Sequence, residues 1–190
     1  MKMYLLRHGE TEEAKKNVIL GHLPGTLTQD GKRYAYRAGE LINHLPVPPD
    51  IIIASGLKRA KDTAEIIGQV TKITVKFDAL LKERKGGDIE GMSDDQIDWE
   101  KYESETQEYR KHKNGESFVE VRERVDDFLK KIPKDSKQTI AIVSHSVVIA
   151  MIISSVLGWG YEKSLDFKFD DSVILLDTKR KEIALVPLIE

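Results

Sequence analysis

The sequence predicts a single α/β domain, a three-layer sandwich in which a mainly parallel sheet is flanked by helices. Short apolar runs typical of buried strands alternate along the chain with longer segments whose apolar residues recur at helical spacing. A length of 190 residues suits one domain, and an apolar content of 40% is enough to bury a core. With this apolar content and a formal net charge of only -2, the chain is not expected to be disordered.

The first half of the chain is expected to hold three strands and two helices. Residues 4–6 predict a short buried strand, and residues 51–54 and 73–77 predict two more, the last at an edge of the sheet. A helix is predicted from Thr28, whose hydroxyl can cap it, to the run of prolines that ends it. A second helix follows the strand at 51–54, and Ser55 is the residue expected to cap it.

The second half is expected to alternate in the same way. Residues 117–132 predict a helix with a strongly apolar stripe. Residues 139–143 lack polar alternation, which predicts a strand buried on both faces, and residues 147–157 predict a nearly all-apolar helix. Residues 172–176 and 183–188 predict two closing strands joined by a turn.

One segment breaks this alternation. Residues 93–115 are dense in charge and hold Trp99, Tyr102 and Tyr109, so they are too polar to belong to the core. We expect a helical insertion over an edge of the sheet, either a solvated excursion or a lid over a site. As a lid, it would use Trp99, Tyr102 and the basic cluster at 110–113 to contact the non-reacting end of a ligand.

The composition excludes several classes of function. Basic and acidic residues number 30 and 32, so no overall charge favours nucleic acid or an anionic membrane as a partner. The absence of cysteine excludes a disulfide scaffold, a thiolate metal site and a cysteine nucleophile. No spacing of histidines or carboxylates suggests a metal site. The apolar runs are too short for a signal peptide or for the ~20 residues of a membrane span, so a soluble, cytoplasmic protein is expected.

Chemically useful side chains follow each of the predicted parallel strands. Arg7 and His8 follow the first strand, Arg59 the second, Glu83 the third and His145 the fourth. Ligands of open α/β sheets bind beyond the carboxyl ends of the strands, so these residues are expected at one rim. A neutral imidazole can be a nucleophile, arginines bind phosphate oxygens, and a carboxylic acid can protonate a leaving oxygen. The set predicts phosphoryl transfer through a phosphohistidine, stabilised by arginines and requiring neither a metal nor another cofactor.

Motifs spread over nearly the whole chain resemble those of the histidine phosphatase superfamily, which has the phosphoglycerate mutase-like fold. They are Leu6-Arg7-His8-Gly9-Glu10-Thr11, Leu27-Thr28-Gln29-Asp30-Gly31, residues 55–64, the acid-bearing loop at 81–91, Gly115-Glu116-Ser117 and Val143-Ser144-His145. Within the first motif, Gly9 would let the backbone pass close to a phosphate.

The resemblance implies a role for each residue at the predicted rim. His8 would be the nucleophile, and Arg7, Arg59 and His145 would bind the transferring phosphoryl group. Glu83 would act first as the general acid and then as the base for water.

Four further residues are candidates for substrate binding. Many members of the family carry an asparagine six residues beyond the nucleophile, where this chain has Ala14, and Asn17 is the nearby residue that could substitute. Ser146 stands where glycine is usual and either narrows the pocket or adds a hydroxyl donor. His22 lies in a Gly- and Pro-rich loop expected to border the pocket, and Arg84 is either a substrate ligand or part of a structural ion pair.

The predicted function is that of a phosphatase acting on a small phosphomonoester. One alternative is a cofactor-dependent phosphoglycerate mutase, although such mutases tend to be longer. Another, of a different class, is a non-catalytic phosphate-binding or scaffold protein, which the departures at Ala14 and Ser146 would allow. A small phosphate ester is the expected partner, without nucleic acid or membrane, and a homodimer is left open. A sugar phosphate, a three-carbon acid phosphate, a ribazole phosphate and a phosphorylated protein all remain candidate substrates.

Overall fold

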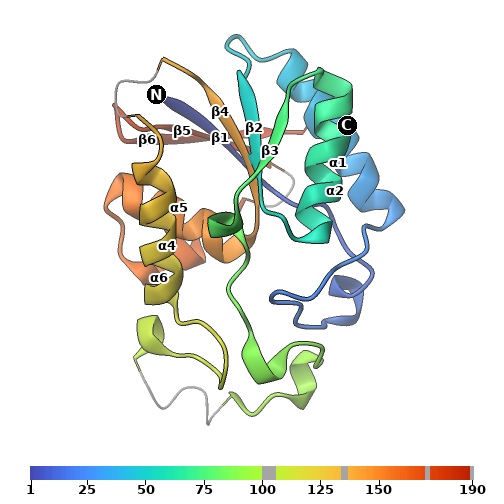
Figure 1. Ribbon diagram of the computed structural model, residues 1–190, viewed down its shortest axis with the longest axis vertical. Helices are drawn as coiled ribbons and strands as arrows, with labels where there is room; N and C mark the ends of the chain where they lie inside the picture. The colour runs from blue at the N-terminus through green and yellow to red at the C-terminus, as the bar shows by residue number, and fades with distance from the viewer. Residues whose placement is uncertain (100–105, 134–136, 170–171, 189–190) are drawn as a thin grey trace.

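A mixed sheet forms the middle layer of the computed structural model (Figure 1). Within the described residues it has six strands in the order β3-β2-β4-β1-β5-β6. They are β1 (Lys2–Arg7), β2 (Ile51–Ala54), β3 (Val75–Phe77), β4 (Ile140–Ser144), β5 (Ser172–Asp177) and β6 (Glu182–Pro187). The first four strands run parallel, and β5 and β6 add an antiparallel edge. The structure describes residues 1–99, 106–133, 137–169 and 172–188.

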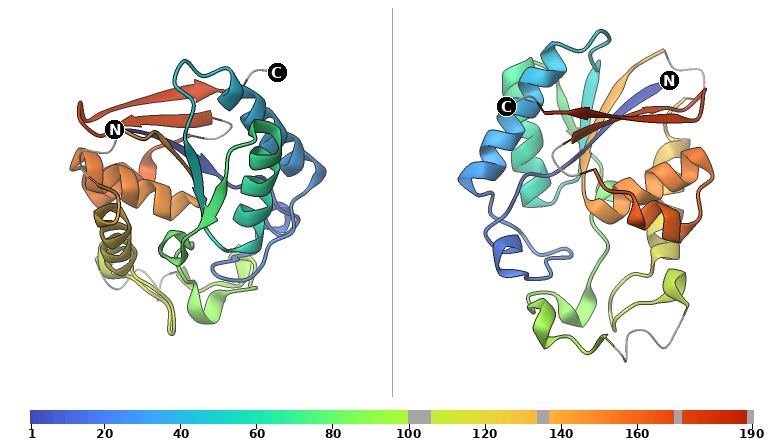
Figure 2. Two further views of the ribbon diagram at one scale, coloured as in Figure 1. Left: turned by 45° about the horizontal axis from the view of Figure 1, so that its top comes forward. Right: turned by 180° about the vertical axis from the view of Figure 1, so that it is seen from behind.

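Helices cover both faces of this sheet, as the two further views in Figure 2 show. They are α1 (Gln29–Asn43), α2 (Lys58–Thr71), α4 (Phe118–Lys130), α5 (Ser146–Leu157) and α6 (Tyr161–Asp166). Helices α1 and α2 pack on one face, and α4 to α6 pack on the other. Among the described residues, no helix combines the length and the apolar character that crossing a bilayer requires.

The core consists of two apolar clusters, one on each face of the sheet. In β1, Met3 and Leu5 face α4 and α5, whereas Tyr4 and Leu6 face α1 and α2. All four side chains are buried because successive residues of a strand point to opposite faces and both faces are covered. The predicted α/β sandwich with a mainly parallel sheet is thereby confirmed, and β3 lies at the sheet edge as expected.

Most predicted helix starts agree with the structure, but one capping residue was wrong. Thr28 caps α1 by accepting a hydrogen bond from the amide of Gly31, at 2.9 Å. Ser55 does not cap α2, whose N-cap is Leu57, because the chain turns for three residues after β2 before the helix begins. The hydroxyl of Ser55 instead accepts from the amide of Leu57 at 3.3 Å within that turn. The short helix α6 was not predicted.

The described parts of the expected insertion, residues 93–99 and 106–115, lie beyond the carboxyl ends of the parallel strands (Figure 1). Its described parts contain two single 3-10 turns, η4 (Asp94–Gln96) and η5 (Gln107–Tyr109). Residues 100–105, including Tyr102, lie outside the described residues, so the helical character of the insertion stays a prediction.

Candidate active site

His8 lies where β1 ends, and the pairing of β1 with β4 determines its surroundings. Its amide donates to the carbonyl of Ser144 at 2.9 Å, continuing the parallel ladder by one residue. The register that aligns Arg7 with Ser144 places His145 beside His8, with ring centroids 5.1 Å apart. Two histidines from distant parts of the sequence therefore meet at the carboxyl end of the sheet, as predicted.

The hydrogen bonds of the His8 ring assign its tautomer. Nδ1 lies 2.8 Å from the carbonyl oxygen of Gly9, so Nδ1 carries the proton and donates. Nε2 accepts from Nε of Arg59 at 3.1 Å and is therefore unprotonated. Desolvation of the ring, followed by the positive charge of Arg59, lowers the pKa of His8 to about 3. His8 is thus a neutral imidazole at neutral pH, with its lone pair on Nε2.

Arg59 is buried in the first turn of α2, with 2% of its surface exposed. Besides His8, its guanidinium donates to the carbonyls of Leu23 and Gly21, both at 2.9 Å. Burial lowers the pKa of Arg59, and the negative charge of Glu83 is the largest opposing influence. The arginine therefore joins the loop that follows η1 (Ala14–Lys16) to the nucleophile-bearing strand, with Glu83 close enough to stabilise its charge.

His145 is fully buried at the start of α5. Its Nε2 lies 2.8 Å from the hydroxyl oxygen of Ser55. That oxygen already accepts from the amide of Leu57, and donation of its own proton to Nε2 of His145 would make Nδ1 the protonated ring nitrogen. Within the described part of the chain, Nδ1 of His145 has no hydrogen-bond partner. Burial, followed by the electrostatic coupling to His8 and the positive charge of Arg59, lowers the pKa of His145, so this ring is also neutral and has one N–H to donate.

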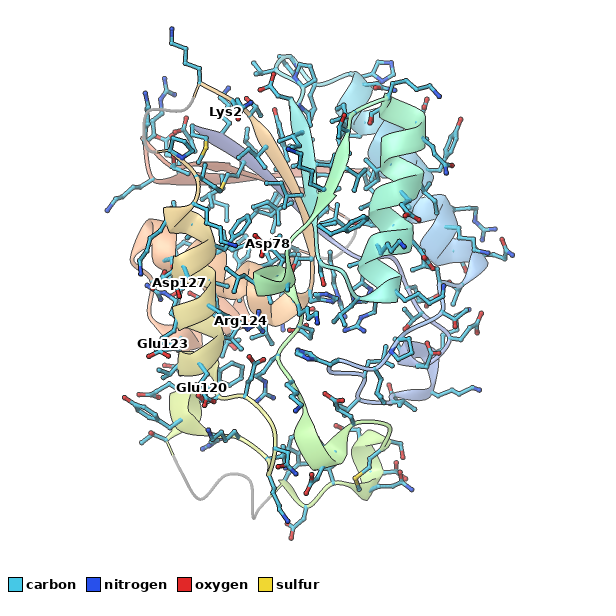
Figure 3. All side chains as sticks on the ribbon, viewed as in Figure 1. Lys2, Asp78, Glu120, Glu123, Arg124 and Asp127 are labelled. Atoms are coloured by element: carbon cyan, nitrogen blue, oxygen red, sulfur yellow. The ribbon has the colours of Figure 1, made fainter. Side chains whose placement is uncertain are left out.

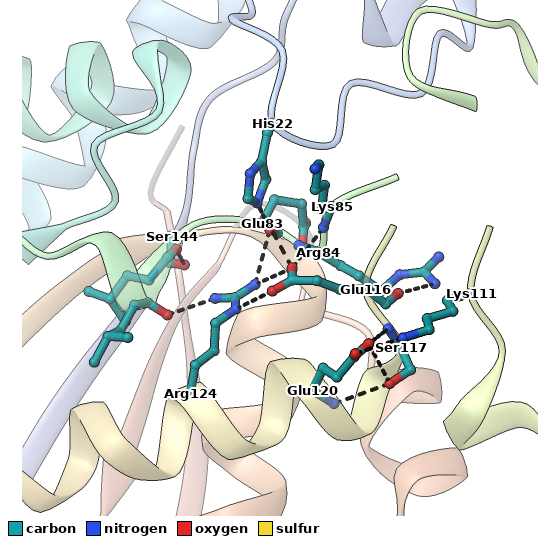
Figure 4. Close-up of polar contacts among 12 residues, drawn as sticks. His22, Glu83, Arg84, Lys85, Lys111, Glu116, Ser117, Glu120, Arg124 and Ser144 are labelled. Atoms are coloured by element: carbon teal, nitrogen blue, oxygen red, sulfur yellow. Dashed lines mark hydrogen bonds and ion pairs between the residues drawn. The ribbon is translucent and has the colours of Figure 1, made fainter. Parts of the chain in front are cut away.

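Glu83 lies in an irregular segment between η2 (Ala79–Leu81) and η3 (Gly87–Ile89). Its carboxylate accepts from the amide of Arg84 at 2.7 Å. Its backbone carbonyl accepts from Nε2 of His22 at 2.6 Å and from Arg124 at 3.0 Å (Figure 4). The structure thus brings Glu83 to the same rim as Arg59, as predicted, and anchors it by its main chain.

Two of the four substrate-binding candidates hold this rim together in the structure. Nε2 of His22 donates to the carbonyl of Glu83, so this atom is already occupied within the protein. The guanidinium of Arg84 packs on the ring of Phe118, 4.5 Å from its centroid, and reaches the carbonyl of Glu116 at 3.4 Å. Both side chains are half-buried, and both contact the backbone next to the acid-bearing loop.

The other two candidates occupy different positions. Ser146 is the first residue of α5, half-buried and directly after His145. Asn17 has left-handed backbone, with φ of 53°, and its carbonyl accepts from the amide of Asp94 at 3.1 Å. Asn17 is exposed at the C-cap of η1, and the structure does not bring it to the cavity beside His8.

A cavity of about 420 Å³ opens beside the nucleophile. It is lined by residues from the end of β1, the start of α1 and the segment before β5. These are Arg7, His8, Gly9, Glu10, Thr11, Ala14, Asp30, Tyr34 and Phe169. Ala14, where many family members carry asparagine, is among them, so the smaller side chain enlarges the space next to His8.

The absence of a side chain at Gly9 is required for backbone packing, as well as for the expected close approach of a phosphate. A Cβ on Gly9 would lie 2.3 Å from the carbonyl oxygen of Gly31, and a Cβ on Gly31 would lie 2.2 Å from that of Glu10. The amide of Gly9 donates to the hydroxyl of Thr63 at 3.1 Å. Two of the sequence motifs therefore meet backbone to backbone, which presses the start of α1 against the nucleophile loop.

Several contributors were not identified from the sequence. Ser55 and Thr63 lie within a quoted motif, but their hydrogen-bond partners come from elements far along the chain. The sequence around Arg124 is that of an ordinary helix with an arginine on its surface. No motif near Phe169 indicates that it lines the cavity. Among the described residues, no group of three or more histidines, aspartates or glutamates is placed to hold a metal ion.

Comparisons with known proteins agree with this arrangement. Residues 3–188 match the histidine phosphatase superfamily (branch 1). Probable phosphoglycerate mutase GpmB from Salmonella arizonae is 31% identical over 166 residues, covering 83% of this chain and 75% of that protein, and its counterpart from Erwinia tasmaniensis matches equally.

Solved structures extend the match to the whole fold. The alpha-ribazole phosphatase from Shigella flexneri superposes with a TM-score of 0.85 at 27% identity, covering 100% of this chain and 96% of that one. A mycobacterial glucosyl-3-phosphoglycerate phosphatase in complex with VO3 gives a TM-score of 0.84 at 25% identity, covering 100% and 99%. The phosphoglycerate mutase-like fold is confirmed, and the chain belongs to the histidine phosphatase superfamily, branch 1.

Proposed function

We propose that this chain is a metal-independent phosphatase that hydrolyses a small phosphomonoester through a phosphohistidine on His8. The observation that carries the proposal is the His8 ring itself. It is neutral, its Nδ1 proton is held by the carbonyl of Gly9, and its Nε2 faces Arg59 at 3.1 Å. A neutral nucleophile with a fixed tautomer beside a buried cation suits phosphoryl transfer through a phosphohistidine.

In the first half-reaction, Nε2 of His8 attacks phosphorus, the N–P bond forms and the bond to the ester oxygen breaks. The Nε–H of Arg59, which donates to His8 in the free protein, donates instead to a phosphoryl oxygen. Arg7 and the Nδ1–H of His145 bind the other phosphoryl oxygens. Glu83, which takes up a proton when the phosphate dianion enters the site, gives that proton to the leaving oxygen, because an alkoxide is too basic to leave unaided. These donors neutralise the charge on the phosphoryl group without a metal ion.

In the second half-reaction, water attacks the phosphorus of phospho-His8. The carboxylate of Glu83 takes a proton from this water, the N–P bond breaks and the electron pair returns to Nε2. Inorganic phosphate leaves, and both His8 and Glu83 regain their starting protonation states. One carboxyl group therefore serves as acid and then as base.

The cavity and the structural relatives support hydrolysis of a small substrate. A volume of about 420 Å³ accommodates a sugar-sized or smaller leaving group. The carboxylates on its wall, Glu10 and Asp30, are paired with Lys15 and Arg33. The two solved structures named above are phosphatases of phosphorylated small molecules by their titles, and each is covered almost completely by this chain.

A second candidate function is that of a cofactor-dependent phosphoglycerate mutase. The relatives at 31% identity are named probable phosphoglycerate mutases, which is the observation that favours mutase activity. Activation by 2,3-bisphosphoglycerate and conversion between phosphoglycerate isomers would identify a mutase. A non-catalytic phosphate-binding or scaffold protein would hydrolyse neither these compounds nor p-nitrophenyl phosphate.

The proposal is tested by a screen of phosphorylated metabolites with the wild type and the His8→Ala variant. We expect release of inorganic phosphate that survives EDTA, is blocked by vanadate and is lost in His8→Ala. Vanadate adopts the five-coordinate geometry of the transferring phosphoryl group. Activity that disappears in EDTA and returns with Mg²⁺ would contradict the metal-free mechanism.

A further inference from the structure

Glu116 and Arg124 form a two-pronged ion pair at the start of α4. Nε and Nη2 of Arg124 donate to the two carboxylate oxygens of Glu116, each at 3.0 Å. Only 15% of the Arg124 side chain and 23% of the Glu116 side chain are exposed, so water screens the pair weakly. A capping box between Ser117 and Glu120 fixes the backbone next to Glu116. Figure 3 shows Arg124 on the inner side of α4 and Glu123 on the outer side.

The same guanidinium also holds the segment that carries Glu83. Nη1 of Arg124 donates to the carbonyl of Leu80 at 2.7 Å, and Nη2 donates to the carbonyl of Glu83 at 3.0 Å (Figure 4). Glu116 adds a further contact, because its carboxylate accepts from the amide of Lys85 at 2.8 Å. The ion pair therefore forms hydrogen bonds with the backbone before Glu83, at Glu83 itself and after it.

Glu83 depends on side-chain contacts of this kind because it lies in neither a helix nor a strand. Buried carbonyls outside regular structure need partners from elsewhere in the fold. Ser144 donates to the carbonyl of Leu81 at 2.8 Å, and His22 donates to that of Glu83 at 2.6 Å. Together with the two bonds from Arg124, these contacts connect the segment to α4, to β4 and to the loop of His22.

We propose that Arg124, held by Glu116, is a positioning residue that sets where the carboxyl group of Glu83 stands relative to His8. The inference rests on the proposed function, in which Glu83 is the proton donor. A planar guanidinium donates in the fixed directions needed by a carboxylate and two carbonyls, whereas an ammonium group does not. A misplacement of about 1 Å in a reacting group is enough to cost on the order of 10²-fold in rate.

The test compares Arg124→Lys with the matched control Arg122→Lys, each in the full chain. Arg122 lies on the same helix but binds Asp126 and Ser154. For Arg124→Lys we expect kcat/KM to fall about 10²-fold on an alkyl phosphate, whose leaving oxygen needs a proton, and far less on p-nitrophenyl phosphate. Lysine keeps the positive charge that helps to lower the pKa of His145, so the comparison isolates geometry. Arg122→Lys should show no such dependence on the leaving group.

Glu83→Gln, alone and combined with Arg124→Lys, shows whether the arginine acts through the acid. We expect Glu83→Gln to damage the alkyl phosphate selectively and Arg124→Lys to add nothing further in that background. Equal losses on both substrates, or a full additional loss in the Glu83→Gln background, would overturn the positioning role and leave the proposed function standing. A Glu83→Gln variant without leaving-group dependence would overturn the role of Glu83 itself. If Arg124→Lys does not fold, Glu116→Gln carries the same expectation.

Discussion

Nε of Arg59 donates to Nε2 of His8 across 3.1 Å, so the nucleophilic lone pair is occupied by a buried cation. The contact orients the ring and repels a proton from it, which is one reason why the pKa of His8 falls to about 3. A phosphoryl group entering the site would offer Arg59 a better acceptor than the imidazole and so release the lone pair for attack.

This relationship predicts that Arg59→Lys is strongly impaired although it keeps the positive charge. A lysine cannot reproduce the fork that binds His8, Gly21 and Leu23 together. We expect kcat/KM to fall by about 10²–10³-fold, the usual cost of losing one preorganised donor. The matched control is Lys58→Gln at the neighbouring exposed cation, and comparable losses in the two variants would contradict the assignment.

Ser55 is predicted to set the tautomer of His145. Ring nitrogen shifts measured by ¹⁵N NMR should show Nδ1 protonated in the wild type and a mixture of tautomers in Ser55→Ala. We expect kcat/KM of Ser55→Ala to fall by about 10- to 100-fold, since an unsatisfied buried partner costs about 1–3 kcal/mol. A wild-type His145 protonated on Nε2 would show that the hydroxyl accepts rather than donates.

The contact between the backbones of Gly9 and Gly31 predicts a large difference between two chemically identical changes. Gly9→Ala would place its Cβ 2.3 Å from a backbone oxygen, whereas a Cβ on Gly56 meets nothing within 4 Å. Gly9→Ala should lower the free energy of unfolding by about 1–3 kcal/mol through overpacking, and Gly56→Ala should change it by less than about 0.5 kcal/mol. Denaturant titration measures both, and equal effects would exclude the packing explanation.

Much of the site could be predicted because ligands of open α/β sheets bind beyond the carboxyl ends of the strands, where its residues lie. Arg7 ends β1, His8 and His145 come directly after buried strands, and Arg59 lies in the first turn of the helix that follows another, so the sheet brings them to one rim. The alternation of strands with helices predicts a mainly parallel sheet, and β1, β2 and β4 do run parallel.

What could not be predicted depends on partners distant in the sequence. Ser55 looked like a helix cap, because a serine before a helix usually is one, and its true partner is 90 residues away. Arg124 and His22 support Glu83 through main-chain carbonyls, which leave no pattern in side-chain spacing. Asn17 matched a missing family residue by proximity in sequence, but it is exposed and is not among the residues that line the cavity.

The lowered pKa values of His8 and His145 predict how stability depends on pH. An unfolded histidine titrates near pH 6.5, so below that pH the unfolded chain binds protons that the folded chain does not. The free energy of unfolding should therefore fall as pH drops from about 6.5 toward about 3, by up to ~1.4 kcal/mol per pH unit from His8, and His145 should act in the same direction. Replacing His8 with asparagine should flatten the slope between about pH 5 and 6.5, above the range of most carboxylates. An unchanged slope would mean that His8 is not desolvated in solution.

The central claim is that phosphate is carried on His8, and rapid quench of the Glu83→Gln variant tests it most directly. Without the carboxylate, transfer from p-nitrophenyl phosphate should proceed while water attack slows, so a phosphoenzyme accumulates. On an alkyl phosphate the same variant should lose about 10²–10⁴-fold, the usual scale of general acid catalysis. Mass spectrometry should find phosphate on His8, labile in acid and stable in base. Turnover with no phosphate on His8 at any time, or with phosphate on another residue, would contradict the account.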